Sequence, residues 1–314
     1  MAAENSTIRK GSAESEALFR GKVLFDLPGE TAKQEPPPKS SEAQPRGEVV
    51  HLPVWPNLVR PIPNGLLRSA LFGVVERGAR RYLRAEPVVA LDGIEIFYTG
   101  EQLDQGDLDV WIAVIQLCRA QAMGERCFFS AYELLKTLGK DDTGGKHGSR
   151  KVLDIRLTRM KATAIRIRVV GRYSYEGSLL DEIYRDEETG RYVAVLNPKM
   201  RALFGQNEYT QLEWSVRQAL EGKPLAQWLH AFFSSHAAPL PISMGKLRGL
   251  CGSEISRERA FKEKLRKALD AVAEASAAHG QPFSFSFEGE LVCVQRTPSA
   301  AQKRHLMKNK APRR

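Results

Sequence analysis

The sequence predicts an α+β protein with two tandem winged-helix domains, a disordered arm before them and a basic tail after them. Three observations lead to this prediction. Helical and strand-like segments occur twice along the chain in the same order. Each helical segment carries apolar residues at three- and four-residue intervals. The third helical segment of each repeat is rich in Lys and Arg. A winged helix is a helix-turn-helix unit followed by a β-hairpin, and its third helix can lie in a DNA major groove.

The composition indicates a globular protein with a polyanionic partner. The 314 residues include 47 Lys and Arg against 37 Asp and Glu, a formal net charge of +10. An excess of positive charge of this size favours binding to nucleic acid. The length predicts about two domains, and the 42 % of hydrophobic residues can fill their cores. No apolar stretch is long enough to span a bilayer and no signal-peptide pattern opens the chain, so we expect a cytoplasmic protein without membrane contact.

No motif predicts catalysis. The four cysteines and six histidines are scattered, which predicts neither a zinc site, nor a disulfide framework, nor the paired-histidine metal site of a DNA-nicking initiator. A segment resembling a phosphate-binding P-loop starts at Gly139. However, five residues instead of four separate Gly139 from Gly145, and His147 stands where that motif has Ser or Thr. We expect a protein that is not an enzyme, with mostly buried reduced thiols and without catalytic residues, metal or cofactor.

The chain begins with a polar, Pro-rich segment, which we assign to residues 1–50 as a flexible arm because its apolar residues are too sparse to offset the entropy of ordering it. One apolar island, Val23 to Leu27, interrupts it and is a candidate docking peptide.

The first winged-helix domain is assigned to residues 51–200. Strands are predicted at Pro87–Leu91 and Gly93–Thr99 around an Asp92-Gly93 turn. Apolar periodicity and a Ser130 capping box predict three helices, at about Asp107–Ala122, Ala131–Leu138 and Ser149–Ala164. Three runs of β-type residues then predict one antiparallel sheet, the wing, at Ala164–Val170, Gly177–Tyr184 and Tyr192–Leu196.

The second winged-helix domain is assigned to residues 201–298 and repeats this order. Helices are predicted at Pro224–Ser235, Ser243–Leu250 and Ser256–Ala275, followed by a hairpin of Phe283–Phe287 with Glu290–Val294. The remaining residues, 299–314, contain several cations and no acid, so we expect a disordered basic tail that adds non-specific affinity for DNA.

The third helix of the first domain carries most of the excess charge. Lys146 to Arg168 holds eight cations against one acid, Asp154, a net charge of +7. With Leu153 and Leu157 facing inward, the 100° step per residue places cations on the outer side. An ordinary solvated helix face is the alternative, but such a face would normally mix charges of both signs. The candidate DNA-binding residues of this domain are Lys146, Arg150, Lys151, Arg159 and Lys161.

The third helix of the second domain shows the same division. Phe261, Leu265, Leu269 and Val272 predict its buried side. Cations gather on the opposite side and in the first turn, where recognition helices usually touch bases. The alternative is a surface helix stabilised by pairs of opposite charge four residues apart. The candidate DNA-binding residues are Arg257, Arg259, Lys262, Arg266 and Lys267.

Several short segments, taken in order, resemble the TrfA family of plasmid replication initiators. They include Phe232-Phe233-Ser234-Ser235-His236, Leu250-Cys251-Gly252-Ser253, Leu203-Phe204-Gly205 and Asp109-Val110-Trp111. The similarity extends from about Pro53 to Arg296.

This resemblance implies two winged-helix domains that bind tandem repeats (iterons) in double-stranded origin DNA. It also implies inactive dimers and active monomers, and recruitment of the host's replication initiator and replicative helicase. Base contact in such proteins falls on the third helix of the second domain, here at Arg257, Arg259, Lys262 and Arg266. Of the family's N-terminal peptide that docks the polymerase sliding clamp, only Leu24-Phe25-Asp26 remains, so Leu24 and Phe25 are the candidate clamp-docking residues. A plasmid-encoded transcriptional repressor with the same helices is the alternative function.

Overall fold

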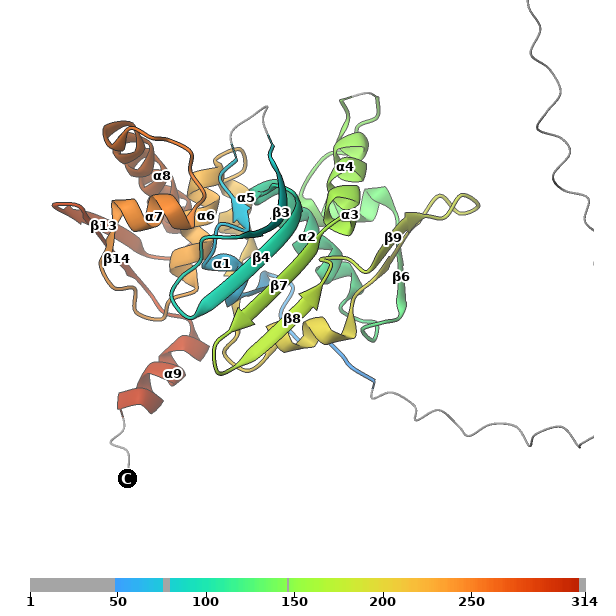
Figure 1. The fold of residues 1–314 in the computed structure, drawn as a ribbon, viewed down its shortest axis with the longest axis horizontal. Coiled ribbons are helices and arrows are strands. Elements are labelled where there is room, and N and C mark those ends of the chain that lie inside the picture. The colour runs from blue at the N-terminus through green and yellow to red at the C-terminus, as the bar shows by residue number, and fades with distance from the viewer. Residues whose placement is uncertain (1–48, 76–79, 146, 311–314) are drawn as a thin grey trace, which may run out of the picture. The chain divides into compact units, whose positions relative to one another are not determined.

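The computed structural model describes residues 49–75, 80–145 and 147–310 (Figure 1), with the side chains of 308–310 excepted. The predicted arm lies almost wholly outside the described residues. Leu24, Phe25 and Lys146 lie outside them as well.

The fold is a mixed α+β structure with two hydrophobic cores. The first core is formed by buried residues from Leu52 to Trp214 together with Ala231. The second is formed by Val74 and by residues from Val216 to Val294. The predicted division of the chain at residue 200 stays a prediction. In the described parts of the chain, no helix combines the length and apolar character needed to cross a bilayer.

A four-stranded antiparallel sheet in the order β3-β4-β7-β8 packs on the first core (Figure 1). Its strands are β3 (Tyr82–Pro87), β4 (Ile94–Glu101), β7 (Ala164–Val169) and β8 (Tyr173–Gly177). The predicted strand Pro87–Leu91 is wrong, because the first strand ends at Pro87. Residues after it hydrogen-bond to the segment at Arg68–Ala70 instead, through Leu91 N to Arg68 O (2.8 Å) and Ala70 N to Val89 O (2.8 Å).

A separate three-stranded sheet has the order β6-β10-β9. It consists of β6 (Arg126–Phe129), β9 (Glu182–Arg185) and β10 (Tyr192–Val195). The prediction of a single sheet from Ala164 to Leu196 is therefore wrong. Between β8 and β9 the chain passes through the core, where Leu179 and Leu180 are buried and Trp111 Nε1 donates to Leu179 O (3.0 Å). This crossing sends the two halves of the run to different sheets.

Two short pairings complete the first core. β1 (Val59–Pro63) pairs with β11 (Tyr209–Glu213), and β2 (Phe72–Gly73) pairs in parallel with β5 (Leu103–Asp104). Three short helical segments accompany them: α1 (Asn64–Leu67), the 3-10 helix η1 (Pro198–Phe204) and α5 (Trp214–Ala219).

The three predicted helices of the first repeat are present, the second with the predicted bounds and the other two with earlier C-terminal ends. They are α2 (Gln105–Cys118), α3 (Ala131–Leu138) and α4 (Ser149–Lys161). The predicted capping box of α3 is confirmed, since Ser130 accepts from Glu133 N and the Glu133 side chain accepts from Ser130 N. Gly139 ends this helix in the left-handed conformation, with φ of 74°. A second capping box, between Asp104 and Asp107, starts α2.

The helices and hairpin of the second repeat are confirmed. They are α6 (Pro224–Ser234), α7 (Met244–Leu250) and α8 (Glu258–Ala278), with β12 (Ile242–Ser243), β13 (Phe283–Glu288) and β14 (Leu291–Arg296). The strand order is β12-β14-β13. Three cysteines, Cys118, Cys127 and Cys251, are buried as expected, and Cys293 is partly exposed.

The predicted disorder of the tail is wrong for residues 300–310, which form α9 (Ala300–Lys310). A capping arrangement starts this helix. Ser299 N donates to Gln302 Oε1 (2.9 Å), and Gln302 N donates to Ser299 Oγ (3.3 Å). Gln302 Nε2 also donates to Ser234 O (2.8 Å) at the end of α6, which holds the first turn of α9 against the second core.

Candidate nucleic-acid interface

The inner side of α4 is as predicted, because Leu153, Leu157 and Met160 are buried. The prediction that Arg159 lies on the outer face is wrong. Its side chain is only 8 % exposed, and Arg159 Nη1 lies 2.8 Å from Asp107 Oδ1 on α2. Lys151 and Lys161 are exposed as predicted.

Arg159 belongs to an ion cluster that joins α4 to the start of α2. Its members are Arg80, Arg156 and Arg159 with Glu101, Asp104 and Asp107. The Asp107 side chain is 0 % exposed and accepts from Arg156 Nη1 (2.8 Å) as well as Arg159. Burial alone would raise the pKa of Asp104, but the charges of Arg156 and Arg80 outweigh it and lower this pKa to about 2. The Asp104 carboxylate is therefore ionised near neutral pH. The ion pairs of Arg156 and Arg159 with Asp104 and Asp107 hold α4 against the start of α2.

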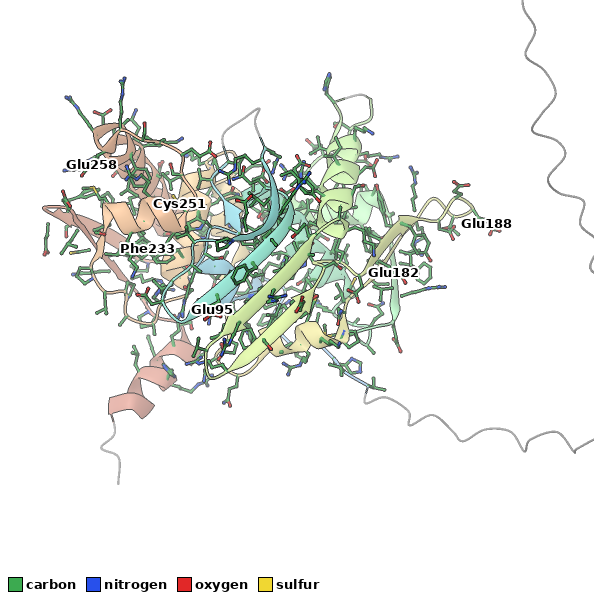
Figure 2. The ribbon with its side chains drawn as sticks, in the orientation of Figure 1. Glu95, Glu182, Glu188, Phe233, Cys251 and Glu258 are labelled. Carbon is green, nitrogen blue, oxygen red and sulfur yellow. The ribbon has the colours of Figure 1, made fainter. Side chains whose placement is uncertain are left out.

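Three further cations of the predicted basic segment are paired with carboxylates. Arg150 makes two hydrogen bonds to Asp142 (2.6 and 2.7 Å). Arg166 pairs with Glu176 (3.2 Å) and Arg168 with Glu95 (3.5 Å) across the four-stranded sheet. Figure 2 shows Glu95 on β4 of this sheet. Most of the +7 charge is therefore neutralised within the protein. In this segment, only Lys151 and Lys161 have no carboxylate partner among the described residues.

Helix α8 keeps its cations available to a partner. Phe261, Leu265 and Leu269 are buried as predicted, with Leu265 at 0 % exposure. Arg257 immediately precedes the first turn, and Arg259 is 93 % exposed, with Nε 3.3 Å from Glu263. Figure 2 shows Glu258 at this end of α8, at the edge of the second core. The first turn of α8 therefore presents exposed cations.

The next turns of α8 place two cations over the hairpin. The Lys262 ammonium and the Arg266 guanidinium lie 5.9 and 4.7 Å from the ring centre of Phe287 on β13. The 100° step puts Arg259, Lys262 and Arg266 on one shoulder of the helix, on the hairpin side, with Lys267 further round. Stacking on an aromatic ring orients a guanidinium while leaving its edge free to donate. We call Arg257, Arg259, Lys262 and Arg266 the α8 cationic face.

The tips of the β9–β10 and β13–β14 hairpins are acidic. The β9–β10 tip carries exposed Glu187 and Glu188, and the β13–β14 tip carries exposed Glu288 and Glu290. Figure 2 shows Glu188 at the first of these tips. Carboxylates repel phosphate, so the tips are unsuited to contact with a DNA backbone.

A buried ion pair between the two cores was not predicted. Arg217 on α5 is 1 % exposed and pairs with Asp109 on α2. Its Nη2 also donates to the backbone and side-chain oxygens of Gln105, each at 3.1 Å. Arg217 and Asp109 lie 108 positions apart, so local sequence patterns carry no signal for this contact.

His230 on α6 is buried next to Arg217 and Arg296, and burial followed by these two charges lowers its pKa to about 3. In the unfolded chain a histidine takes up its proton near pH 6.5. The unfolded state therefore binds more protons below this pH, and the free energy of unfolding falls as pH falls.

We expect His230 alone to remove about 1 kcal/mol of stability between pH 6.5 and 5.5. Denaturant unfolding at these two pH values measures the change. His230→Leu should reduce the pH dependence by this amount, and an unchanged pH dependence in the variant would contradict the assignment.

The comparisons with known proteins agree with the sequence similarity. A family model described as TrfA protein matches residues 43–281. The chain belongs to the TrfA family. The plasmid replication initiator protein TrfA of Escherichia coli is 29 % identical over 224 residues, which are 69 % of this chain and 57 % of that protein. The matched region thus spans little more than half of the relative's length.

A crystal structure of selenomethionine derivatives of domain 2 and domain 3 of RctB is also similar, with a TM-score of 0.48 and 14 % identity. It covers 74 % of this chain and 96 % of that chain.

The TrfA family match includes all of α4 and α8 and ends before β13. The helix that carries the α8 cationic face therefore lies in the family region. The β13–β14 hairpin, with Phe287, and α9 lie beyond it.

Proposed function

We propose that this protein is a plasmid replication initiator that binds tandem iterons in double-stranded origin DNA. The observation that carries the proposal is the α8 cationic face, held outward by a fully buried apolar stripe, in a chain of the TrfA family. A helix of this kind can enter a major groove, where arginine donates to guanine and lysine to phosphate or guanine.

The proposal includes a pair of winged-helix domains. The order α2-β6-α3-α4-β9-β10 in the first core matches α6-β12-α7-α8-β13-β14 in the second, with β7 and β8 inserted after α4. The sheets β6-β10-β9 and β12-β14-β13 also share one strand order. This repetition supports two units of the same kind, each with a third helix available for DNA.

The two units have different roles in this proposal. Arg257, Arg259, Lys262 and Arg266 read bases, with Lys267 beside them. Lys151 and Lys161 contact phosphates. Arg150 joins them when its ion pair with Asp142 is replaced by a contact with a DNA phosphate. Arg159 has no such role, because it holds α4 to α2.

Origin opening then follows from DNA binding and from recruitment of host proteins, without bond chemistry by the protein itself. The proposed partners in the bacterial cytoplasm are the host replication initiator, the replicative helicase, the sliding clamp and a second copy of the chain in a dimer–monomer equilibrium. Magnesium-dependent cleavage of origin DNA, or ATP turnover, by the purified protein would contradict the non-enzymatic part of this proposal.

Maintenance of a plasmid in trans tests the proposal. A plasmid that carries only the cognate origin should replicate when this protein is supplied from elsewhere, and footprinting should show protected sites at the repeat spacing. Protection of a promoter without plasmid maintenance would instead indicate a transcriptional repressor.

The backbone role of α4 predicts a change in salt dependence. We expect Lys151→Gln/Lys161→Gln to weaken binding to iteron and random duplex equally, and to reduce the slope of log K against log salt by about one per lost phosphate contact. Fluorescence anisotropy across a salt series measures the slope. Arg166→Gln removes an exposed but paired cation and serves as the control. The same reduction in the control would contradict the role of α4.

A further inference from the structure

An open pocket of about 520 Å³ lies beside Trp214, and no residue of α8 lines it. We call it the Arg60 pocket. It lies between β1, the ends of α2 and α3, and the start of α5, and its volume is within the range of small-molecule sites. The lining residues that matter to its chemistry are Asn57, Arg60, Gln116, Arg119, Lys136 and Trp214.

Three cations and no carboxylate line the Arg60 pocket. None of Arg60, Arg119 and Lys136 has an ion-pair partner among the residues that the structure describes. Arg60 is only 7 % exposed, and burial followed by the charge of Arg119 lowers its pKa to about 10. Burying a guanidinium next to a second one is unfavourable unless an opposite charge compensates.

The ends of two helices supply part of this compensation. α2 ends at Cys118 and α3 at Leu138, and free carbonyls at a helix C-terminus carry partial negative charge. Arg60 Nη1 also donates to Asn57 O (2.6 Å) and Val59 O (3.0 Å), and Arg119 Nη2 donates to Asn57 Oδ1. These contacts use one nitrogen of each guanidinium.

Three buried nitrogen atoms of the pocket residues have no hydrogen-bond acceptor among the described residues. Arg60 Nε, Arg119 Nη1 and Trp214 Nε1 are buried without a hydrogen-bond partner in the described structure. All three are donors, so the group that would satisfy them is an acceptor. The Arg60 guanidinium is held in a fixed plane 5.1 Å from the Trp214 ring centre. Planar guanidinium donors match the oxygens of a phosphate group.

We propose that the Arg60 pocket binds the phosphate group of an anionic ligand. Arg60 and Arg119 donate to the phosphate oxygens, and Lys136 supplies a third positive charge at the exposed side. The site is distinct from the α8 cationic face, because none of its lining residues belongs to that face.

Calorimetric titration of the full chain with pyrophosphate tests the proposal without DNA. We expect saturable one-to-one binding that Arg119→Gln/Lys136→Gln weakens at least tenfold, because two charge-assisted contacts are lost. Lys140→Gln is the matched control: it removes one charge near the same end of α3 but lies outside the pocket lining. Lys136→Gln alone changes an exposed residue and keeps the test valid should the double variant unfold. Absence of saturable binding, or equal loss in the control, overturns the proposal.

Two sources could supply the phosphate group, and displacement of bound pyrophosphate distinguishes them. Displacement by a nucleoside diphosphate, but not by duplex DNA, assigns the site to a free nucleotide. Displacement by duplex DNA assigns it to the DNA backbone. Displacement by neither overturns the proposal.

Discussion

Charge reversal at the start of α8, Arg257→Glu/Arg259→Glu, is expected to weaken binding to iteron DNA by about a hundredfold or more. Each good base contact contributes about 1–3 kcal/mol of discrimination. Arg257 immediately precedes α8, Arg259 lies in its first turn, and both side chains are exposed. The new carboxylates also repel phosphate. Binding to random duplex should fall much less, so specificity should fall with affinity. Anisotropy titrations of both duplexes at one salt concentration measure the two losses.

A matched variant separates this local effect from the change in net charge. Arg185→Glu/Lys199→Glu reverses two exposed cations on β9 and η1, far along the chain from α8. Equal weakening by the two double variants would show that net charge alone governs binding. We expect the Arg257→Glu/Arg259→Glu variant to fold, because acidic side chains at a helix N-terminus interact favourably with the helix dipole. Loss of the exposed Arg259–Glu263 pair acts in the opposite direction with a similar small magnitude, so the melting temperature of the α8 variant should change little.

Local patterns in the sequence were enough to predict the second repeat. The apolar stripe of α8 and the helices α6 and α7 depend on residues three and four positions apart, and the structure places these residues as expected. The start of α9 also has a local signal, a Ser299-x-x-Gln302 capping pattern, which could have corrected the expected disorder of the tail.

Two features of the first repeat could not be read from local patterns. Strands β7 and β8 have the alternation of a wing, but β7 pairs with β4, about 70 residues earlier, and this pairing brings both strands into the four-stranded sheet. Arg159 was assigned to the outer face because its position was judged from the helix alone. Long arginine side chains can reach round a helix, and its carboxylate partner Asp107 lies 52 residues earlier.

The ion pairs that join α4 to Asp107 on α2 should contribute strongly to the stability of the fold. Asp107→Ala should lower the free energy of unfolding by about 3–5 kcal/mol, the usual effect of removing one member of a buried ion pair. Asp107 accepts from Arg156 and Arg159 and from Asp104 N (2.9 Å), so the substitution leaves two arginines short of a partner and breaks the capping box of α2. Denaturant unfolding measures the loss.

Asp142→Ala is the control for this prediction, since it also removes a carboxylate that pairs with an α4 arginine, but at the surface. Exposed ion pairs contribute little because water and salt screen them. If the free energy of unfolding changes little in Asp142→Ala and falls strongly in Asp107→Ala, burial is what makes the ion cluster between α2 and α4 important for stability. Equal small losses would mean that Leu153, Leu157 and Met160 hold α4 in place without the arginines. Arg156 and Arg159 would then be free to turn outward, and α4 would regain the cationic surface that its sequence suggests.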